Sequence, residues 1–193
     1  KAPLVARLDD DDLWIDKEKL SKQLRRFEEE PTLVLLGTGV IVQDEEGRVL
    51  YNFRNPETDS EIRKRILYRN CFSHSSVMFK RSLALSCGGY SEHEQTLHIE
   101  DYELWLRLGR HGKMANLPDL SLAFTVRADA ISGKHKLEQL WRQLEISRVF
   151  RADYPNYPLS RIQGYARFIG YKLFGHLLPK QLLTRLIARY KQN

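Results

Sequence analysis

A short apolar segment, residues 4–8, runs without a break into four consecutive aspartates, residues 9–12. The segment has the composition of a short buried strand, and that strand ends where the acidic run begins. In an α/β sheet, chemistry is usually placed at the carboxyl end of a strand. This junction therefore predicts an α/β fold with a carboxylate cluster at the edge of its sheet.

The aspartate run offers ligands for a hard metal ion. Side chains alternate along an extended backbone, so we expect Asp9 and Asp11 to point the same way. Two carboxylates there suit Mg²⁺ or Mn²⁺, and such an ion can bridge to a diphosphate. A solvated loop is the alternative for an isolated acidic run, but the position directly after an apolar strand favours function. An EF-hand calcium loop is not expected, because the turn glycine and the closing glutamate are absent.

The segment after the aspartates predicts an amphipathic helix. Asp16 is expected to cap this helix, and Pro31 is expected to end it. Its buried stripe is predicted from apolar residues spaced i, i+4, i+7, namely Leu20, Leu24 and Phe27.

Strands and helices are expected to follow one another along the rest of the chain. In order, we predict a hairpin of residues 33–42 and 51–53 with its turn at 44–47, a charged surface helix over 57–68, a strand over 76–79, a helix over 80–86 stopped by Gly88 and Gly89, a helix over 100–110, a strand over 120–126, and helices from Leu137 with breaks near Pro155 and Pro179.

Glu100 and Asp101 open one of these predicted helices. Its apolar positions fall on one face: Leu104, Trp105 and Leu108. Acidic residues at a helix N-terminus ordinarily complement the helix dipole, and that is the alternative to a functional role. An aspartate in this position is expected to stay ionised, which a general base needs at neutral pH.

The positive charge of the chain is concentrated in its last third. Residues 134–193 hold 12 Lys and Arg against 3 Asp and Glu, whereas residues 1–133 hold 19 against 22, which together give the net charge of +6. Apolar and aromatic residues accompany the basic ones, among them Leu182, Leu183, Leu186, Ile187 and Tyr190. We expect a helical extension at an anionic membrane surface. The alternative is an extension that packs on the domain with a solvated basic face; nucleic-acid binding is not expected, because no recognisable module accompanies the charge.

The two cysteines, Cys71 and Cys87, lack a CxxC pattern and zinc-ligand spacing, so we expect free thiols. No apolar run approaches the roughly 20 residues that span a bilayer. The chain begins at Lys1 and enters an apolar stretch at once, which predicts a start in the middle of a domain.

Four segments together resemble the family-two glycosyltransferases of the GT-A fold. They are residues 6–14 (ARLDDDDLW), 74–81 (HSSVMFKR), 88–90 (GGY) and 100–108 (EDYELWLRL), in the order and at the spacings usual in that family. The resemblance covers about residues 4 to 132. It implies a partial GT-A domain over residues 1–133, whose N-terminal, nucleotide-binding half would precede Lys1, followed by a basic helical extension over residues 134–193.

The resemblance also assigns roles to individual residues. Asp9 and Asp11 match the acidic positions of the DxD motif, which holds the donor diphosphate through a divalent metal. Asp101 matches the general base that deprotonates the acceptor hydroxyl, and attack opposite the leaving diphosphate inverts the anomeric configuration. Glu100, His74 and Ser75 are expected to line the site, although His74 could equally be a structural histidine.

One departure from the family pattern concerns residue 127. Many relatives carry a histidine there that helps to bind the metal or the diphosphate, whereas this chain has Arg127. An arginine can neutralise a diphosphate, but it cannot ligate a metal. We therefore expect Arg127 to line the site as a charge.

The expected function is transfer of a sugar from a nucleotide-sugar donor to a glycan or lipid-linked acceptor, in cell-surface polysaccharide synthesis at the cytoplasmic face of a bacterial membrane. The chain alone is expected to be inactive without its nucleotide-binding half. Two alternatives remain: a non-catalytic, membrane-docked relative or scaffold of a glycan-synthesis complex, and a phosphatase of the haloacid dehalogenase type. That phosphatase chemistry needs a hydroxyl residue near the acidic pair, where this chain has Leu13 and Trp14.

Overall fold

The computed structural model describes residues 2–126 and 135–174 of the chain. Within these residues the centre of the fold is a six-stranded sheet in the order β1-β5-β3-β6-β2, with β4 paired onto β3. The strands are β1 (Leu4–Ala6), β2 (Leu13–Trp14), β3 (Leu33–Gln43), β4 (Val49–Phe53), β5 (Met78–Lys80) and β6 (Lys113–Thr125). The pair β3–β6 is parallel and the other pairs are antiparallel, so the predicted α/β class is confirmed with a mixed sheet.

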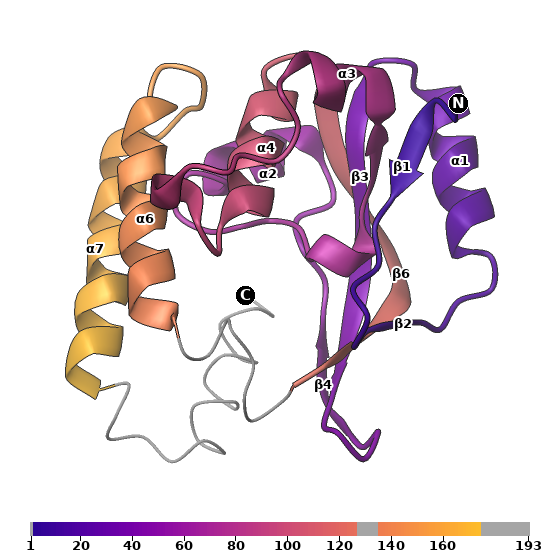
Figure 1. Ribbon diagram of the computed structural model, residues 1–193, viewed down its shortest axis with the longest axis horizontal. Coiled ribbons are helices and arrows are strands. Elements are labelled where there is room, and N and C mark those ends of the chain that lie inside the picture. Colours follow the sequence, from indigo (N-terminus) through magenta and orange to yellow (C-terminus); the bar gives the residue numbers. More distant parts are fainter. Residues whose placement is uncertain (1, 127–134, 175–193) are drawn as a thin grey trace.

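Helices cover both faces of this sheet (Figure 1). Helix α1 (Lys19–Glu29) lies on one face, and α2 (Asp59–Arg65) and α4 (Glu100–Gly109) lie on the other. Helices α6 (Lys136–Val149) and α7 (Tyr157–Phe174) form a further layer outside α4. The short helix α3 (Arg81–Ser86) follows β5, and two 3₁₀ turns, η1 (His74–Ser76) and η2 (Glu94–Thr96), lie in the connections.

Strand β3 is central because both of its faces are covered. Residues 33–40 are all buried. Leu36 joins a cluster with Phe27 of α1, whereas Leu35 joins the larger cluster that contains Trp105 of α4. A strand that is covered on both sides has a continuous apolar sequence instead of an alternating one. The run of Leu, Val and Ile that predicted the first hairpin strand is explained by this position.

Several predicted turns and helix ends are confirmed. Strands β3 and β4 form the expected antiparallel hairpin, and Gly47 in its turn has φ of 79°. Gly88 and Gly89 follow α3 with φ of 92° and 70°, a left-handed conformation that glycine adopts without steric cost. Both cysteines are free thiols, as predicted, and burial raises the pKa of the Cys71 thiol to about 11.

Two elements differ in length from the prediction. Helix α2 is limited to seven residues, and it begins with a capping box in which Thr58 and Glu61 each accept a hydrogen bond from the other's backbone N–H. Strand β6 begins at Lys113, seven residues earlier than predicted. Its pairing with β3 skips from Leu117 to Leu120, so Pro118 stands in a bulge. The first half of the strand was not predicted, because a proline normally argues against a strand. A bulge is one of the few sheet positions where proline fits.

The predicted apolar stripe of α1 was wrong, apart from Phe27. Leu20 and Leu24 are 42% and 46% exposed, whereas Lys19 and Gln23 are buried. The Gln23 amide donates hydrogen bonds to the carbonyl oxygens of Leu36 and Ser76, at 2.9 and 3.0 Å. The polar side chain is buried because it bridges β3 and η1, which periodicity cannot show.

The start of α1 also differs from the prediction. The N-cap residue is Glu18, not Asp16, and its side chain makes no capping bond. Asp16 lies just before the helix, where its carboxylate accepts a hydrogen bond from the backbone N–H of Glu18 at 2.9 Å. The same carboxylate pairs with Lys22, at 2.9 Å, so it still steadies the first turn.

Helices α6 and α7 pack on the domain. The chain breaks between them near Pro155, as predicted, and Asn156 there has φ of 64°. Ile146 and Phe150 join the main core cluster, and the Tyr154 hydroxyl donates a 2.7 Å hydrogen bond to the carbonyl of Leu106. The described part of the basic extension, residues 135–174, therefore packs on the domain.

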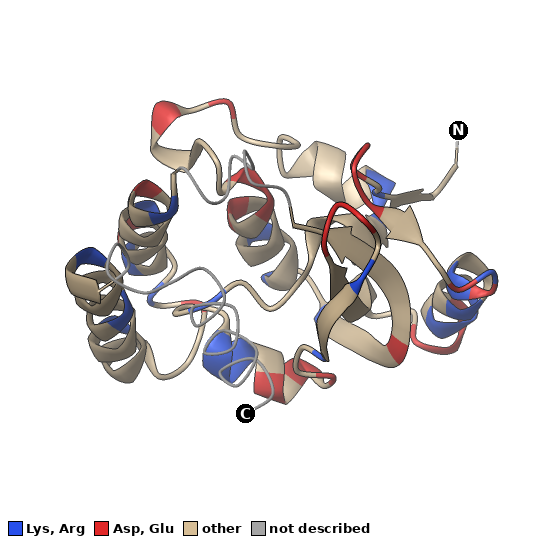
Figure 2. Cartoon of the chain, turned by 90° about the horizontal axis from the view of Figure 1, so that it is seen from below, with Lys and Arg blue, Asp and Glu red and all other residues tan. Residues whose placement is uncertain are grey.

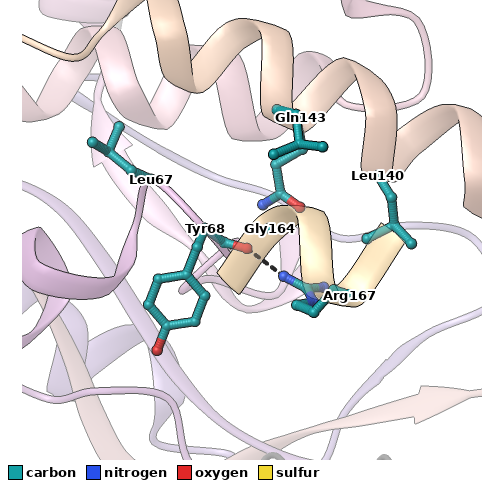
Figure 3. A pocket seen from close by; sticks show the side chains of 7 residues that line it. Leu67, Tyr68, Leu140, Gln143, Gly164 and Arg167 are labelled. Carbon is teal, nitrogen blue, oxygen red and sulfur yellow. Dashed lines mark hydrogen bonds between the residues drawn. The ribbon is translucent and has the colours of Figure 1, made fainter. Parts of the chain in front are cut away.

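A shallow indentation lies between α6, α7 and the segment after α2 (Figure 3). Arg167 of α7 closes one side by donating a hydrogen bond to the carbonyl of Tyr68. Gly164 lets the helices approach, because a Cβ at this position would lie 2.5 Å from a carbon of Leu144. None of the predicted site residues that the structure describes lines this indentation.

Some predictions fall outside the described residues. These are Arg127, the predicted boundary at residues 133–134, the break at Pro179 and the apolar stripe from Leu182 to Tyr190. Within the described residues, no helix is long and apolar enough to cross a membrane. Lys and Arg occur along both α6 and α7 (Figure 2), and α7 contains no Asp or Glu.

Candidate functional site

The four aspartates form a turn at the end of β1. The backbone N–H of Asp12 donates to the carbonyl of Asp9 at 3.3 Å, so this segment is not extended. The expectation that Asp9 and Asp11 alternate along a straight strand was therefore wrong. Asp9 is half-buried, Asp10 and Asp11 are exposed, and Asp12 is buried with 9% of its surface exposed. The turn thus separates one inward carboxylate from its exposed neighbours.

Ser75 of η1 joins the two ends of this turn. The Ser75 hydroxyl accepts a hydrogen bond from the backbone N–H of Asp9 at 3.1 Å and lies 3.0 Å from the Asp9 carboxylate. It also makes a short hydrogen bond to Asp12, whose other oxygen accepts from the backbone N–H of Thr125 at 3.2 Å. Burial raises the pKa of Asp12 above its ordinary value. Asp12 therefore links the acidic turn to the end of β6.

His74 lies between the acidic turn and the residue after the glycine pair. Its Nδ1 is 3.1 Å from the Asp9 carboxylate, and its Nε2 is 3.0 Å from the Tyr90 hydroxyl. The rings of His74 and Tyr90 meet edge to face at 5.7 Å. The hydrogen bond from His74, together with its charge and with Ser75 and Arg7, outweighs burial and lowers the pKa of Asp9 to about 2.

The same contacts favour a charged imidazole. Burial opposes the charge of His74, but the hydrogen bond to Asp9 and the negative charges of Asp101 and Asp9 outweigh it, so the pKa of His74 lies above its ordinary value. Two carboxylates from different elements thus favour the protonated form of His74. The ring also lies 6.3 Å from that of Trp105, one turn after Asp101 on α4.

Asp101 stands in the first turn of α4 and is half-buried. One oxygen accepts a hydrogen bond from the side-chain amide of Asn70 at 3.0 Å. Burial raises the pKa of Asp101, while the charge of His74 and the bond from Asn70 act in the opposite direction. A carboxylate with a raised pKa is a stronger base than one in water, which suits proton abstraction. Beside it, one carboxylate oxygen of Glu100 is buried and has no hydrogen-bond partner among the described residues.

Arg107 holds the turn that presents Tyr90. Its guanidinium pairs with Glu103 one helical turn back, at 2.5 Å. It also donates to the carbonyl of Gly89, at 2.7 Å, and to that of Cys87. Glu103 and Arg107 belong to the segment that carried the family resemblance. Their hydrogen bonds give a physical reason for a glutamate and an arginine at these two positions.

The structure brings together four predicted site residues: Asp9 from the turn after β1, His74 and Ser75 from η1, and Asp101 from α4. Glu100 precedes Asp101 in α4. Sequence reasoning missed Asp12, Asn70 and Tyr90. Asp12 was hidden because four identical residues give no indication of which one is buried. Tyr90 stood in a quoted segment, and its place directly after a glycine turn was the available signal.

A divalent metal would fit the acidic turn by its chemistry, since carboxylate oxygens are the ligands of Mg²⁺ and Mn²⁺. Both oxygens of Asp9 are already engaged, one with Arg7 at 2.7 Å and the other with His74 and Ser75. A metal at Asp9 would therefore replace at least one of these contacts. Asp11 is exposed and free to approach such an ion from solvent.

No protein-family model matches the chain. The fold matches that of Staphylococcus aureus TarS, residues 1–349, with a TM-score of 0.56 at 17% identity, over 97% of this chain and 54% of that one. This mixed α/β fold corresponds to about half of a GT-A glycosyltransferase structure.

The relatives in sequence are bacterial glycosyltransferases. The chain is 32% identical over 147 residues to the amylovoran biosynthesis glycosyltransferase AmsE of Erwinia amylovora. The aligned region covers 76% of this chain and 53% of AmsE. It is 27% identical over 188 residues to an uncharacterized glycosyltransferase of Haemophilus influenzae, covering 96% and 67%. It is 32% identical over 112 residues to the O-antigen biosynthesis glycosyltransferase WbnJ of Escherichia coli, covering 56% and 40%. The chain thus resembles bacterial family-two-like glycosyltransferases and spans about half the length of AmsE.

Proposed function

We propose that this chain is the catalytic-site part of an inverting glycosyltransferase, which moves a sugar from a nucleotide-diphosphate donor to a hydroxyl of a glycan or lipid-linked acceptor. The observation that supports it best is the convergence of Asp9, His74 and Asp101 from three separate elements. The names of AmsE and WbnJ point to surface polysaccharide synthesis as the setting. The part that binds the nucleotide base would belong to the length of the relatives that this chain does not span.

In this proposal Asp101 takes the proton from the acceptor hydroxyl. The hydroxyl oxygen forms a bond to the anomeric carbon, and the bond from that carbon to the donor diphosphate breaks with its electron pair on the phosphate. Attack from the side opposite the diphosphate inverts the configuration. A divalent metal on Asp9 and Asp11 would stabilise the charge that develops on the leaving diphosphate.

The remaining residues support these two roles. His74 is within hydrogen-bond distance of Asp9 and is influenced by the negative charge of Asp101; its protonated form would limit the repulsion between these two carboxylates. Ser75 stabilises the turn that carries Asp9, because its hydroxyl oxygen accepts a 3.1 Å hydrogen bond from the backbone N–H of Asp9. Glu100 offers a buried oxygen next to the base, and Arg127 would add positive charge toward the diphosphate.

We further propose that the protein works at the inner face of the cytoplasmic membrane. Helix α7 has exposed apolar residues beside basic ones: Ile162, Ile169, Leu173 and Phe174 are more than half exposed, and Lys172 lies among them. Such a face suits an anionic membrane surface. Binding to vesicles with and without anionic lipid measures this directly, and equal binding to both would contradict it.

The enzymatic proposal is tested by release of nucleoside diphosphate from UDP-, GDP- and dTDP-sugars, using a protein of the full length of the relatives. The comparison is wild type against Asp101→Asn, each with Mn²⁺, Mg²⁺ or EDTA. The matched control is Asp119→Asn, because that carboxylate pairs with Lys22 of α1 at 2.7 Å and has no role in the proposed chemistry. We expect metal-stimulated release that falls at least about 100-fold in Asp101→Asn, the usual contribution of a general base.

Other outcomes separate the alternatives. Release that EDTA does not change would support a glycosyltransferase that needs no metal, in which Arg127 binds the diphosphate. Full release by Asp101→Asn would remove Asp101 as the base. If no donor sugar binds at all, the chain belongs to a non-catalytic scaffold of a glycan-synthesis complex.

A further inference from the structure

A second group of metal-binding side chains lies apart from the acidic turn. His98 precedes α4, and His135 and Glu138 stand at the start of α6. Each offers one ligand atom, and these three atoms all lie within 4.8 Å of one another. Within the described residues this is the one group of three or more such side chains that is close enough to hold an ion.

The two imidazole rings already face one another. Their centroids are 4.3 Å apart and their planes are inclined by 26°. Nδ1 of His135 is 3.1 Å from the Glu138 carboxylate, one helical turn later. The ligands of a tetrahedral zinc ion lie roughly 3.4 Å from one another, given bonds of about 2.0–2.1 Å. Side-chain rotations are therefore enough to close the group around an ion.

The backbone around His98 is held in place from α6. Its φ of 66° is uncommon for a residue other than glycine, and such a conformation persists only where its surroundings impose it. Gln139 donates a hydrogen bond to the carbonyl of His98 at 3.1 Å, and Arg142 donates to that of Leu97 at 2.8 Å. Both bonds thus join the first turns of α6 to the loop that carries His98.

We infer that His98, His135 and Glu138 form a binding site for Zn²⁺ or a similar divalent transition metal. Two imidazoles and one carboxylate are a zinc ligand set that leaves a fourth position for water, and the exposure of Glu138 at 56% opens that position to solvent. The ion would displace the 3.7 Å contact between Arg142 and Glu138. It would also fasten α6 to the loop that leads, three residues later, into Asp101.

This site is chemically distinct from the acidic turn. Imidazole ligands favour Zn²⁺, Co²⁺ and Ni²⁺, whereas an all-oxygen set favours Mg²⁺ and Mn²⁺. The two sites are therefore separated by placing the test in an Asp9→Asn, Asp11→Asn background, in which the acidic turn has lost the two carboxylates proposed as its metal ligands. Failure of the zinc site would leave the glycosyltransferase proposal untouched.

Isothermal titration with ZnCl₂ alone tests the inference. We expect the background protein to bind one equivalent of zinc, and binding to weaken at least about 10-fold in His135→Ala and in Glu138→Gln, as removal of a ligand or of its support usually does. The matched control is His111→Ala, an exposed histidine elsewhere, which should bind as the background does.

A second measurement guards against variants that fail to fold. Co²⁺ bound by this ligand set gives visible absorption bands, and Glu138→Gln, whose side chain is largely exposed, should fold normally and lose the tetrahedral spectrum. Zinc binding that is the same in His98→Ala, His135→Ala and Glu138→Gln as in the background would overturn the site. So would the absence of binding to the background at equimolar zinc.

Discussion

Exchanging Gln23 for leucine places an apolar residue at a buried position of α1, and we expect it to destabilise the protein. The Gln23 side chain has no exposed surface. Its amide donates to the carbonyl oxygens of Leu36 and Ser76, and its oxygen accepts from the Lys19 ammonium at 2.8 Å. Leucine has a similar volume but satisfies none of these three groups.

The size of the effect follows from those three groups. Each buried polar group left without its partner costs about 1–3 kcal/mol. Lys19 adds to the cost at neutral pH, because burial lowers its pKa only to about 8 and the ammonium remains charged. Burial of the leucine side chain returns about 1.5–3 kcal/mol. We expect Gln23→Leu to lower the free energy of unfolding by about 2–4 kcal/mol.

The matched comparison is Leu24→Gln, the reverse exchange at the next residue. Leu24 is 46% exposed, so this change should alter the free energy of unfolding by no more than about 0.5 kcal/mol. Guanidinium denaturation followed by tryptophan fluorescence measures both variants against the wild type. The opposite order, with Leu24→Gln costly and Gln23→Leu neutral, would refute the described orientation of α1 and restore the apolar stripe predicted from its sequence.

Two further predictions concern the site and the C-terminal helices. The pKa of Asp9 is about 2 in the folded protein, against 3.8 ordinarily, so its stabilising effect is present above about pH 4 and is lost as the pH falls toward 2. Urea denaturation should therefore show Asp9→Asn losing less stability than the wild type over that interval. NMR titration should show a lower pKa for His74 in the variant, and an unchanged pKa would contradict the contact between His74 and Asp9. In α7, Gly170→Ala meets open space and should stabilise by up to about 1 kcal/mol through helix propensity. Gly164→Ala would bring a Cβ to 2.5 Å from a side chain of α6 and should lower the melting temperature, and equal effects of the two changes would argue against the described packing of α6 on α7.

The candidate site shows how far a local pattern can predict chemistry. The aspartate run after β1 and the acidic start of α4 were both visible in the sequence, because strand ends and helix starts are local features. Their meeting around His74 was not visible, since 65 residues separate His74 from Asp9. The family resemblance suggested this meeting, and the fold shows the hydrogen bonds that produce it.

The aspartates themselves illustrate the limit. Their turn, closed by the bond from Asp12 to the Asp9 carbonyl, depends on Ser75 and on the end of β6. Four identical residues in a row contain no periodic signal, so burial of Asp12 and exposure of Asp11 follow only from what packs against each. The roles of Asp9 and Asp11 toward a metal remain predictions for that reason.

By itself, the amino-acid sequence determined the α/β class, the hairpin, the helix stop at Gly88 and Gly89, and the free state of both cysteines. Each depends on short-range properties: apolar runs, glycine conformations and the absence of paired cysteine spacings. Only the tertiary structure decided that Gln23 is buried while Leu24 is exposed, and that Pro118 lies inside a strand. A side chain is buried when groups distant in the sequence leave partners for it, and those partners exist only once the sheet and its helices have assembled.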